Sequence, residues 1–593
     1  MMYAGKQGRG RNDGSDKVKN RSYVLKRLWK YLYFYRRKLY IALFFTVITN
    51  ALSLVGPYLT GETIGAMENG VDFQKVFFFA GMMIIFYLLS AFISYILSVQ
   101  MTKISQAVTY KMRKDLFEKL NHVSIKYFDQ NQTGDIISRM SYDIDTINTS
   151  LANDVIHVFT SIITVVISLV MMIIMSKTLI LVFVLTIPIS IMITKVLSKI
   201  VKQKYRVRNQ KLGEMNGFAE EMITGQRTIQ SYVQEEAVLA RFDEINEEAT
   251  TASYQSGYYS TSVGPSVNFV SNLSVALVGV FGGILYFFSQ ITLGNLTSFT
   301  LYSRRFSGPI NSLSNIMADI QSALAAAERV FHVIDHENEP QDINDALEYH
   351  DVFGNVKFDH VSFGYLEHQP VLKNVSFQAE QGKVVAIVGP TGAGKTTLVN
   401  LLMRFYDVNE GQIYLDQHET RTLTRNSLRR AFSMVLQDTW IFHGTVHDNI
   451  AYGNNDVSRM EVEEAAKKAR IHSFISHLPN GYDTILTDEG LNISKGQKQL
   501  LVIARAMLSK TKMLILDEAT SNVDTHTEVQ IQKAMLALME HKTTFVIAHR
   551  LSTIQNADLI LVVKEGDIIE QGNHQTLMQK QGFYYELYQS QFA

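Results

Sequence analysis

One segment of the sequence combines residue types that suit the binding of phosphate groups. It consists of Gly389, Pro390, Thr391, Gly392, Ala393, Gly394, Lys395, Thr396 and Thr397, and it directly follows an apolar run over residues 384–388. Glycines let backbone amides turn toward phosphate oxygens, and the N-terminus of a following helix attracts the same anions. Lys395 can then reach the outer phosphates, and the Thr396 hydroxyl can bind Mg²⁺. The order predicts a strand, a phosphate-binding P-loop and a helix.

A second segment is an apolar run that ends in two carboxylates, Asp517 and Glu518. At the end of a buried strand, Asp517 is placed to hold Mg²⁺, usually through water, and Glu518 can orient and polarise an attacking water. An exposed acidic strand end is the alternative interpretation. The P-loop favours the catalytic interpretation, because a bound nucleotide needs both a Mg²⁺ ligand and a residue that activates water.

The composition around these two segments indicates how they are positioned. After Asp335 the chain changes to short β-rich runs separated by polar turns. We therefore expect a linker over residues 336–353 and an α/β P-loop ATPase domain over residues 354–593.

The first half of the chain is instead dominated by six apolar runs. A bilayer core needs about 20 apolar residues in one helix. The runs cover approximately residues 39–59, 76–99, 155–175, 179–197, 263–288 and 291–313. They predict a membrane α-helical domain with six transmembrane helices over residues 37–335, preceded by a basic tail over residues 1–36. The lipid bilayer is therefore an expected partner.

Lys and Arg residues beside these runs predict the orientation of the chain. The stretch before the first run carries Lys26, Arg27, Lys30, Arg36, Arg37 and Lys38, and the long segments after the second and fourth runs are also basic. Positive charge is enriched on the cytoplasmic side of membrane proteins. We expect a multi-pass protein of the cell membrane with both termini in the cytoplasm; only Lys177, in the second outer loop, departs from the rule.

The two long inner segments, residues 100–154 and 199–262, have helical spacing and mixed charge. We expect them to continue the membrane helices into water. Turn-prone residues interrupt each segment at its middle, at 131–135 and 224–227. Short helices at these tips could rest on a cytoplasmic partner domain, and solvated loops are the alternative.

Arg304 and Arg305 lie inside the sixth apolar run, where an unpaired charge is costly. The two arginines could face a water-filled path and contact substrate. Alternatively, they could snorkel or pair with another helix. Lys+Arg and Asp+Glu are equal at 56 each, so no global charge argues for a nucleic-acid partner. The chain contains no cysteine, which excludes disulfides and thiolate metal sites.

Taken together, these motifs resemble those of ABC exporter half-transporters over nearly the whole chain after the tail. The resemblance implies that ATP and Mg²⁺ bind. It further implies that Tyr365 stacks on adenine, that Gln437 touches Mg²⁺ and water, that Asp524 belongs to the loop crossing to a partner ATPase domain, and that His549 contacts the γ-phosphate. The tips near residues 127–139 and 224–229 match the coupling helices of this family.

One motif departs from the family. Ser494, Gly496 and Gln497 stand where the family's Leu-Ser-Gly-Gly-Gln signature caps the γ-phosphate held by the other subunit, but Lys495 replaces the first glycine. A side chain there is expected to disturb the approach of backbone amides to phosphate. Harmless drift is the alternative. The pattern resembles heterodimeric exporters with one degenerate ATP site, so the expected partner is a different half-transporter with an intact signature.

The resulting expectation is an ATP-hydrolysing exporter half that moves amphipathic small molecules by alternating access. Export of a lipid or a peptide is the alternative within the same fold. A nucleotide-gated channel or sensor is the rival from another class, and the roles expected for Glu518 and His549 in hydrolysis argue against it.

Overall fold

The computed structural model describes residues 20–68, 70–366, 369–437, 439–454, 456–486, 493–517, 524–547 and 551–592. These residues form two compact units. The helical unit contains residues 20–122 and 132–336, and the α/β unit contains residues 123–131 and 337–592. Residues 123–131 therefore belong to the α/β unit although both flanking segments belong to the helical unit.

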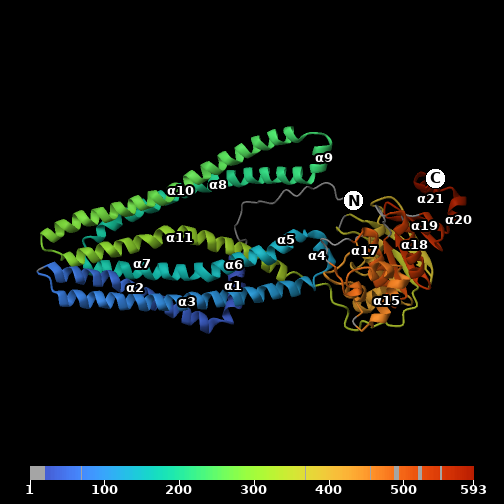
Figure 1. The fold of residues 1–593 in the computed structure, drawn as a ribbon, viewed down its shortest axis with the longest axis horizontal. Helices are drawn as coiled ribbons and strands as arrows, with labels where there is room; N and C mark the ends of the chain where they lie inside the picture. The colour runs from blue at the N-terminus through green and yellow to red at the C-terminus, as the bar shows by residue number, and fades with distance from the viewer. Residues whose placement is uncertain are drawn as a thin grey trace. The chain divides into compact units, whose positions relative to one another are not determined.

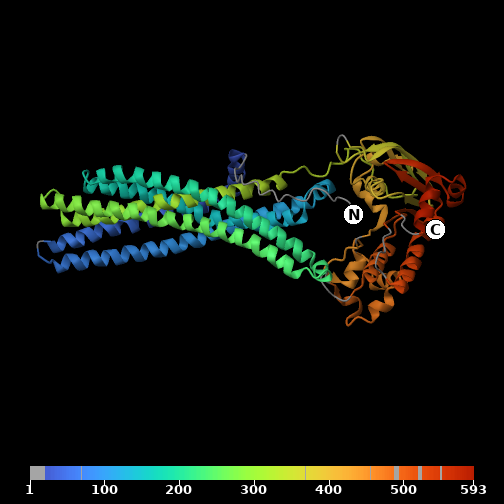
Figure 2. The same ribbon diagram turned by 90° about the horizontal axis from the view of Figure 1, so that it is seen from above.

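The helical unit is a bundle of long helices (Figures 1 and 2). Its helices are α1 (Arg21–Tyr33), α2 (Arg36–Glu68), α3 (Phe73–Leu120), α5 (Thr133–Ser138), α6 (Ile144–Thr149), α7 (Val155–Met175), α8 (Ile180–Thr224), α9 (Gln226–Ser231), α10 (Glu235–Phe287) and α11 (Leu293–Ile334). Two single π-helical turns, η1 (Arg139–Asp143) and η2 (Ser150–Asp154), flank α6.

Five helical segments among the described residues are long and apolar enough to cross a bilayer. They are Arg36–Glu68, Phe73–Leu120, Thr133–Met175, Ile180–Thr224 and Glu235–Phe287, and each overlaps one of the expected spans. The sixth expected span lies within α11, which does not reach the same apolarity and carries Arg304 and Arg305. α11 is nevertheless an inner helix of the bundle. Its residues Phe299, Tyr302 and Phe306 are almost fully buried against α2, α7, α8 and α10.

The helices extend well beyond the thickness of a membrane. At 1.5 Å per residue, the 48 residues of α3 span about 72 Å, against about 30 Å for a bilayer core. The expected continuation of the membrane helices is thus confirmed. So are short helices at the two tips: α4 (Ile125–Gln130) lies between α3 and α5, and α9 joins α8 to α10. In Figure 1, α8 and α10 diverge from the other helices of the bundle toward α9.

Part of the expected N-terminal tail is the helix α1, whose buried residues are Val24, Leu28 and Tyr31. Its 3.6-residue spacing of apolar side chains lets one face pack on the bundle. Polar contacts fix it further: Tyr31 donates to Asp115 at 2.7 Å, and both Tyr23 and Arg27 donate to Asp335 at the end of α11. The beginning of the described chain is therefore joined to the end of the helical unit.

The α/β unit contains two main sheets among its described residues. A six-stranded sheet has the order β12-β11-β3-β10-β9-β6, in which β6, β9, β10, β3 and β11 are parallel and β12 is antiparallel to β11. An antiparallel sheet has the order β2-β1-β4-β5. The strands are β1 (Val356–Phe363), β2 (Leu372–Ala379), β3 (Val384–Val388), β4 (Glu410–Leu415), β5 (His418–Glu419), β6 (Phe432–Val435), β7 (Gly444–Thr445), β8 (Ile485–Leu486), β9 (Met513–Asp517), β10 (Thr543–Ile547), β11 (Leu559–Lys564) and β12 (Asp567–Gly572).

Helices connect and follow the strands after β3 in the α/β unit. They are α12 (Lys395–Leu402), α13 (Arg425–Arg430), α14 (Val446–Ala451), α15 (Arg459–Lys468), α16 (His472–Ser476), α17 (Lys495–Leu508), α18 (Thr525–Met539), α19 (Leu551–Gln555), α20 (His574–Lys580) and α21 (Phe583–Phe592), with 3₁₀ turns η3 (Thr420–Thr422) and η4 (Gly481–Asp483).

The sheet has a hydrophobic core on each face, and its strands alternate between them. Ala386 and Val388 of β3 join one core with α14, α15, α17 and α18, whereas Val385 and Ile387 join the other with α12 and the antiparallel sheet. Burial on both faces explains why β3 is a continuous apolar run. A helical membrane domain fused to an α/β P-loop domain is the architecture expected from the sequence.

Candidate nucleotide-binding site

The parallel strands bring the chemistry-bearing segments to one edge of the sheet. Ile547, the last residue of β10, pairs with Ile387 of β3 on one side and with Asp517 of β9 on the other. The carboxyl ends of parallel strands meet at the same edge, where ligands bind in open α/β sheets. The P-loop after β3 and the carboxylate at the end of β9 therefore flank one strand end.

The P-loop has the backbone geometry that its glycines predict. Gly392 and Gly394 have φ of +85° and +107°, which L residues rarely adopt. A side chain at Gly389 would also place its Cβ 2.1 Å from the carbonyl oxygen of Val563 on β11. The loop thus lies close against β11 and leads directly into α12 at Lys395.

Lys395 lies over this loop and is largely buried. Its Nζ donates to the backbone carbonyls of Gly389 at 2.8 Å and Pro390 at 3.0 Å. Burial lowers the pKa of Lys395, and the negative charge of Asp517 partly opposes that shift. An ammonium group held above glycine-rich backbone, with a carboxylate nearby, fits the phosphates of a nucleoside triphosphate with Mg²⁺.

The remaining P-loop residues divide between the surface and the interior. Thr391 is exposed in the loop and Thr396 at the start of α12, so the Thr396 hydroxyl is accessible to a metal ion. Ala393 and Thr397 are buried. Thr397 faces the interior of the domain, where its Oγ1 lies 3.2 Å from the Tyr365 hydroxyl. Tyr365 is thereby held against α12, beside the loop.

Two further candidates lie at strand or helix ends. Gln437 is exposed two residues beyond β6, and β6 pairs in parallel with β9, so that Val435 lies opposite Leu516. Asp524 caps α18, since its Oδ1 accepts a hydrogen bond from the Thr527 amide at 2.9 Å. That backbone hydrogen bond lowers the pKa of Asp524. Glu518 and His549 lie outside the described residues.

The signature segment begins α17. Ser494 and Gln497 form a capping box there, while Lys495 is exposed and Gly496 is buried. α17 packs against α14, α15, α18 and β6, whereas α12 packs against β10. Among the described residues, α17 and α12 therefore pack against different elements.

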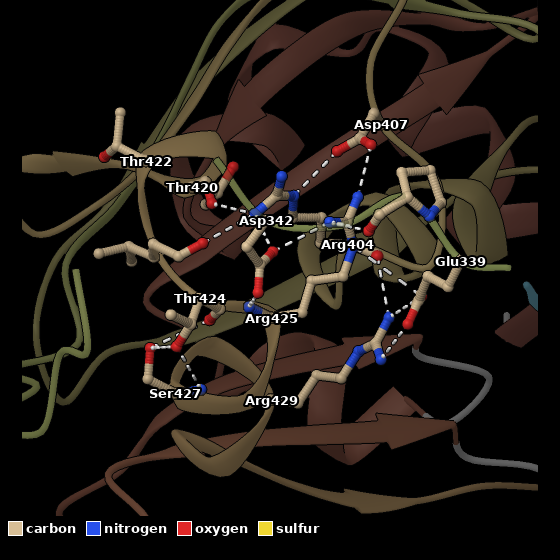
Figure 3. Close-up of polar contacts among 12 residues, drawn as sticks. Glu339, Asp342, Arg404, Asp407, Thr420, Thr422, Thr424, Arg425, Ser427 and Arg429 are labelled. Carbon is tan, nitrogen blue, oxygen red and sulfur yellow. Dashed lines mark hydrogen bonds and ion pairs between the residues drawn. The ribbon is translucent and has the colours of Figure 1, made fainter. Parts of the chain in front are cut away.

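A buried ionic network anchors the segment that follows α11, as Figure 3 shows. Arg404 and Arg425 are 6% exposed, and both bind Asp342 of this segment and Asp407. Arg429 holds the nearby Glu339 at 3.1 Å. Buried charges of this kind are tolerated only when paired, so the network fixes the linker segment firmly to the turn after α12.

Residues 123–131, which we name the docking segment, contact the same turn. Tyr406 donates a hydrogen bond to Asp129 of α4. Tyr127 is 3% exposed, and Val123 forms a β-bridge with Asn338. The sequence predicted this tip but not the pairing of Asp129 with Tyr406, because no local pattern pairs residues so far apart in the chain.

Comparisons with known proteins match both units. The description "ABC transporter transmembrane region" fits residues 39–310, and "ABC transporter" fits residues 372–521. The chain is 40% identical over 576 residues to the uncharacterized ABC transporter ATP-binding protein YfiC of Bacillus subtilis, covering 97% of this chain and 95% of that protein. The chain belongs to the ABC exporter family. Its nucleotide-binding unit is accordingly an ATPase coupled to transport.

Other members of the family have more specific names. A fatty acid ABC transporter ATP-binding/permease protein of Mycobacterium tuberculosis is 40% identical, covering 88% of this exporter and 82% of that protein. An ATP-dependent lipid A-core flippase of Syntrophus aciditrophicus is 35% identical, covering 86% and 84%. A bacterial Atm1-family ABC exporter solved with ATP bound superimposes with a TM-score of 0.75 at 30% identity, covering 94% of this exporter and 98% of that chain.

Proposed function

We propose that this exporter half moves amphipathic small molecules out of the cell by alternating access, driven by ATP hydrolysis. The observation that carries the ATPase part is the strand register that puts the P-loop and Asp517 on either side of the end of β10. In this proposal Lys395 and the loop amides bind the phosphates, and Thr396, Asp517 and Gln437 hold Mg²⁺. The metal would neutralise phosphate charge, while Glu518 orients water and His549 contacts the γ-phosphate.

An amphipathic cargo suits the surface between α8 and α10. A cavity of about 430 Å³ lies there, with Thr194, Ser198, Lys202, Ser260, Val263 and Asn268 among its lining residues. Apolar and hydroxyl groups with a single lysine match molecules that have an apolar body and a polar or anionic end. The relatives named for fatty acid and lipid A-core support a lipid as the second candidate cargo.

The proposed orientation places α1 on the cytoplasmic surface of the membrane. Leu25 and Trp29 are exposed on α1, and so are Lys26 and Lys30. Aromatic and apolar side chains beside lysines are typical of helices that lie at an interface with anionic lipid. This pattern supports cytoplasmic termini.

We further propose that a second, different half-transporter completes the ATP sites. Lys495 gives this chain an altered signature, so the competent site would combine the P-loop of this chain with the intact signature of the partner. The exposed tip of the helical unit offers a surface for such a partner: α9 has no buried residue, and Ile223 and Val233 beside it are more than three-quarters exposed.

Vesicle transport tests the proposal. Inside-out vesicles containing the exporter with its partner are expected to accumulate a dansyl-labelled fatty acid only with ATP and Mg²⁺, and Lys395→Ala is expected to abolish that accumulation. Probe movement that runs downhill with ATP bound but not hydrolysed would instead indicate a gated channel. Full transport by the Lys395→Ala exporter would refute the assigned role of the P-loop.

A further inference from the structure

We infer that Tyr406 is a positioning residue that couples the adenine-stacking position at Tyr365 to the docking segment, through its hydrogen bond with Asp129. The inference rests on the proposed ATP site, with the base stacked on Tyr365 as the family resemblance implies. In this inference, binding of a nucleobase, and not of phosphate alone, changes the dynamics of the docking segment.

The first step of this route is a cluster of three rings. Tyr365 and Tyr406 meet edge to face, with centroids 5.0 Å apart and planes at 87°. Phe363, which is 4% exposed, meets Tyr365 at 5.0 Å and Tyr406 at 5.6 Å. Packed rings in this arrangement cannot move independently. A displacement of Tyr365 must therefore displace Tyr406.

The Tyr365 hydroxyl is fixed to the P-loop helix. It lies 3.2 Å from Thr397 Oγ1, and Asn400 donates to it at 3.2 Å, both from α12. The ring of Tyr365 is thus the part available for a base, because its hydroxyl is already bound to α12. Stacking of a base would limit the remaining motion of this ring.

The second step is the bond between Tyr406 and the docking segment. Burial, with the hydrogen bond to Asp129, raises the pKa of Tyr406, so the hydroxyl stays a donor at neutral pH. Hydrogen bonds to a charged acceptor are stronger than neutral ones. Asp129 lies in the last turn of α4, next to the buried Tyr127.

The third step is the rigidity of the turn that carries Tyr406. Its neighbours Arg404 and Asp407 are bound to each other at 2.9 Å, and Arg425 binds Asp407 at 2.7 Å. Arg404 also adopts a left-handed φ of +50°, which its buried contacts hold in place. Because the backbone is held, a change at the Tyr365 ring passes to the side chain of Tyr406 and to Asp129.

Amide hydrogen exchange of the docking segment tests the coupling without a known cargo. The full-length exporter with its partner would be compared in three states: without nucleotide, with adenylyl imidodiphosphate, and with inorganic tripolyphosphate, which has no base. We expect the ATP analogue to slow exchange in residues 123–131 by about threefold or more, and tripolyphosphate at saturation to leave it unchanged. Equal protection by both ligands would overturn the inference.

Variants separate the hydrogen bond from the packing. Tyr406→Phe keeps the ring cluster and should bind the analogue with affinity within about twofold of the unchanged exporter, yet lose the base-dependent protection. Asp129→Ala should have the same effect, whereas Asp129→Asn keeps an acceptor oxygen and should retain protection. The double variant Tyr406→Phe/Asp129→Ala should lose no more protection than either single variant.

A matched control is the pair Tyr349 and Asp416, which shares the tyrosine–aspartate hydrogen bond at 2.9 Å but whose tyrosine ring contacts His418. Tyr349→Phe should leave the protection intact; loss of protection would show that Tyr406→Phe acts by general loosening. Tyr365→Ala tests the underlying proposal. Unchanged affinity in Tyr365→Ala would refute base stacking, whereas weakened affinity there with normal protection in Tyr406→Phe would refute only the coupling.

Discussion

Ser494 and Gln497 hold each other at the N-terminus of α17: the Ser494 amide donates to Gln497 Oε1 at 2.9 Å, and the Gln497 amide donates to Ser494 Oγ at 3.2 Å. This reciprocal cap uses no atom of the Lys495 side chain. The departure from the family signature thus adds an exposed cation at a helix N-terminus without opening the cap. A cation there opposes the helix dipole unless an anion faces it.

Lys495→Gly should change little when the exporter is paired with a different half-transporter. In the proposed heterodimer, the site that contains Glu518 takes its signature from the partner, so total ATP hydrolysis should stay within about twofold. The family resemblance implies a partner that lacks the catalytic glutamate, so a second active site should appear only if that carboxylate is also restored. Turnover by this chain alone, compared with the pair, decides the matter: full hydrolysis by a homodimer, insensitive to Lys495, would contradict the heterodimer proposal.

Glu518→Gln should stop nearly all hydrolysis while ATP still binds. The amide keeps the shape of the side chain but cannot act as a base, and loss of general base catalysis costs about 10²–10⁴-fold in rate. The measurements are steady-state phosphate release and equilibrium binding of a fluorescent ATP analogue. Substantial turnover with normal binding would remove Glu518 from the base role.

Arg304 and Arg305 should respond differently to replacement. Arg305 donates to Ser53 of α2 at 2.8 Å, so Arg305→Gln should act partly on helix packing. Arg304 is exposed and has no hydrogen-bond or ion-pair partner among the side chains that the structure describes. Arg304→Gln should therefore reduce transport of anionic amphiphiles relative to neutral ones, with basal ATPase activity retained. Equal transport of a matched anionic and neutral pair before and after the change would exclude Arg304 from the pathway.

Arg329 should be needed for the stability of the helical unit. It binds Asp143 of η1 at 2.9 and 2.6 Å, and Asp143 is 3% exposed. Because Arg329→Ala leaves a buried carboxylate unpaired, we expect a loss of about 2–3 kcal/mol, seen as a lower melting temperature in detergent.

The exposed pair Arg241 and Glu244 supplies the control for that measurement. Both side chains are about 60% exposed, so Arg241→Ala should be nearly neutral. Removing Asp143 together with Arg329 should cost less than the sum of the single replacements. Additive losses would indicate that the two residues do not act as a pair.

Local patterns in the sequence predicted the fold class and named the residues of the candidate site. The glycine spacing predicted a loop whose amides turn toward phosphate, and the positive φ of Gly392 and Gly394 is a conformation that glycine adopts readily. Long apolar runs predicted membrane helices, and turn residues at 131–135 predicted the break after α4. Each of these requirements is met by neighbours in the chain, so each is visible in the residues themselves.

The tertiary structure alone decided which of these elements meet. No local pattern states that β10 lies between β3 and β9, yet this register brings Asp517 to the edge that carries the P-loop. Likewise, Tyr406 and Asp129 are 277 residues apart, and no local pattern pairs them. Such pairings depend on how sheets, helices and buried charges pack against one another, which is a property of the whole fold and not of any segment.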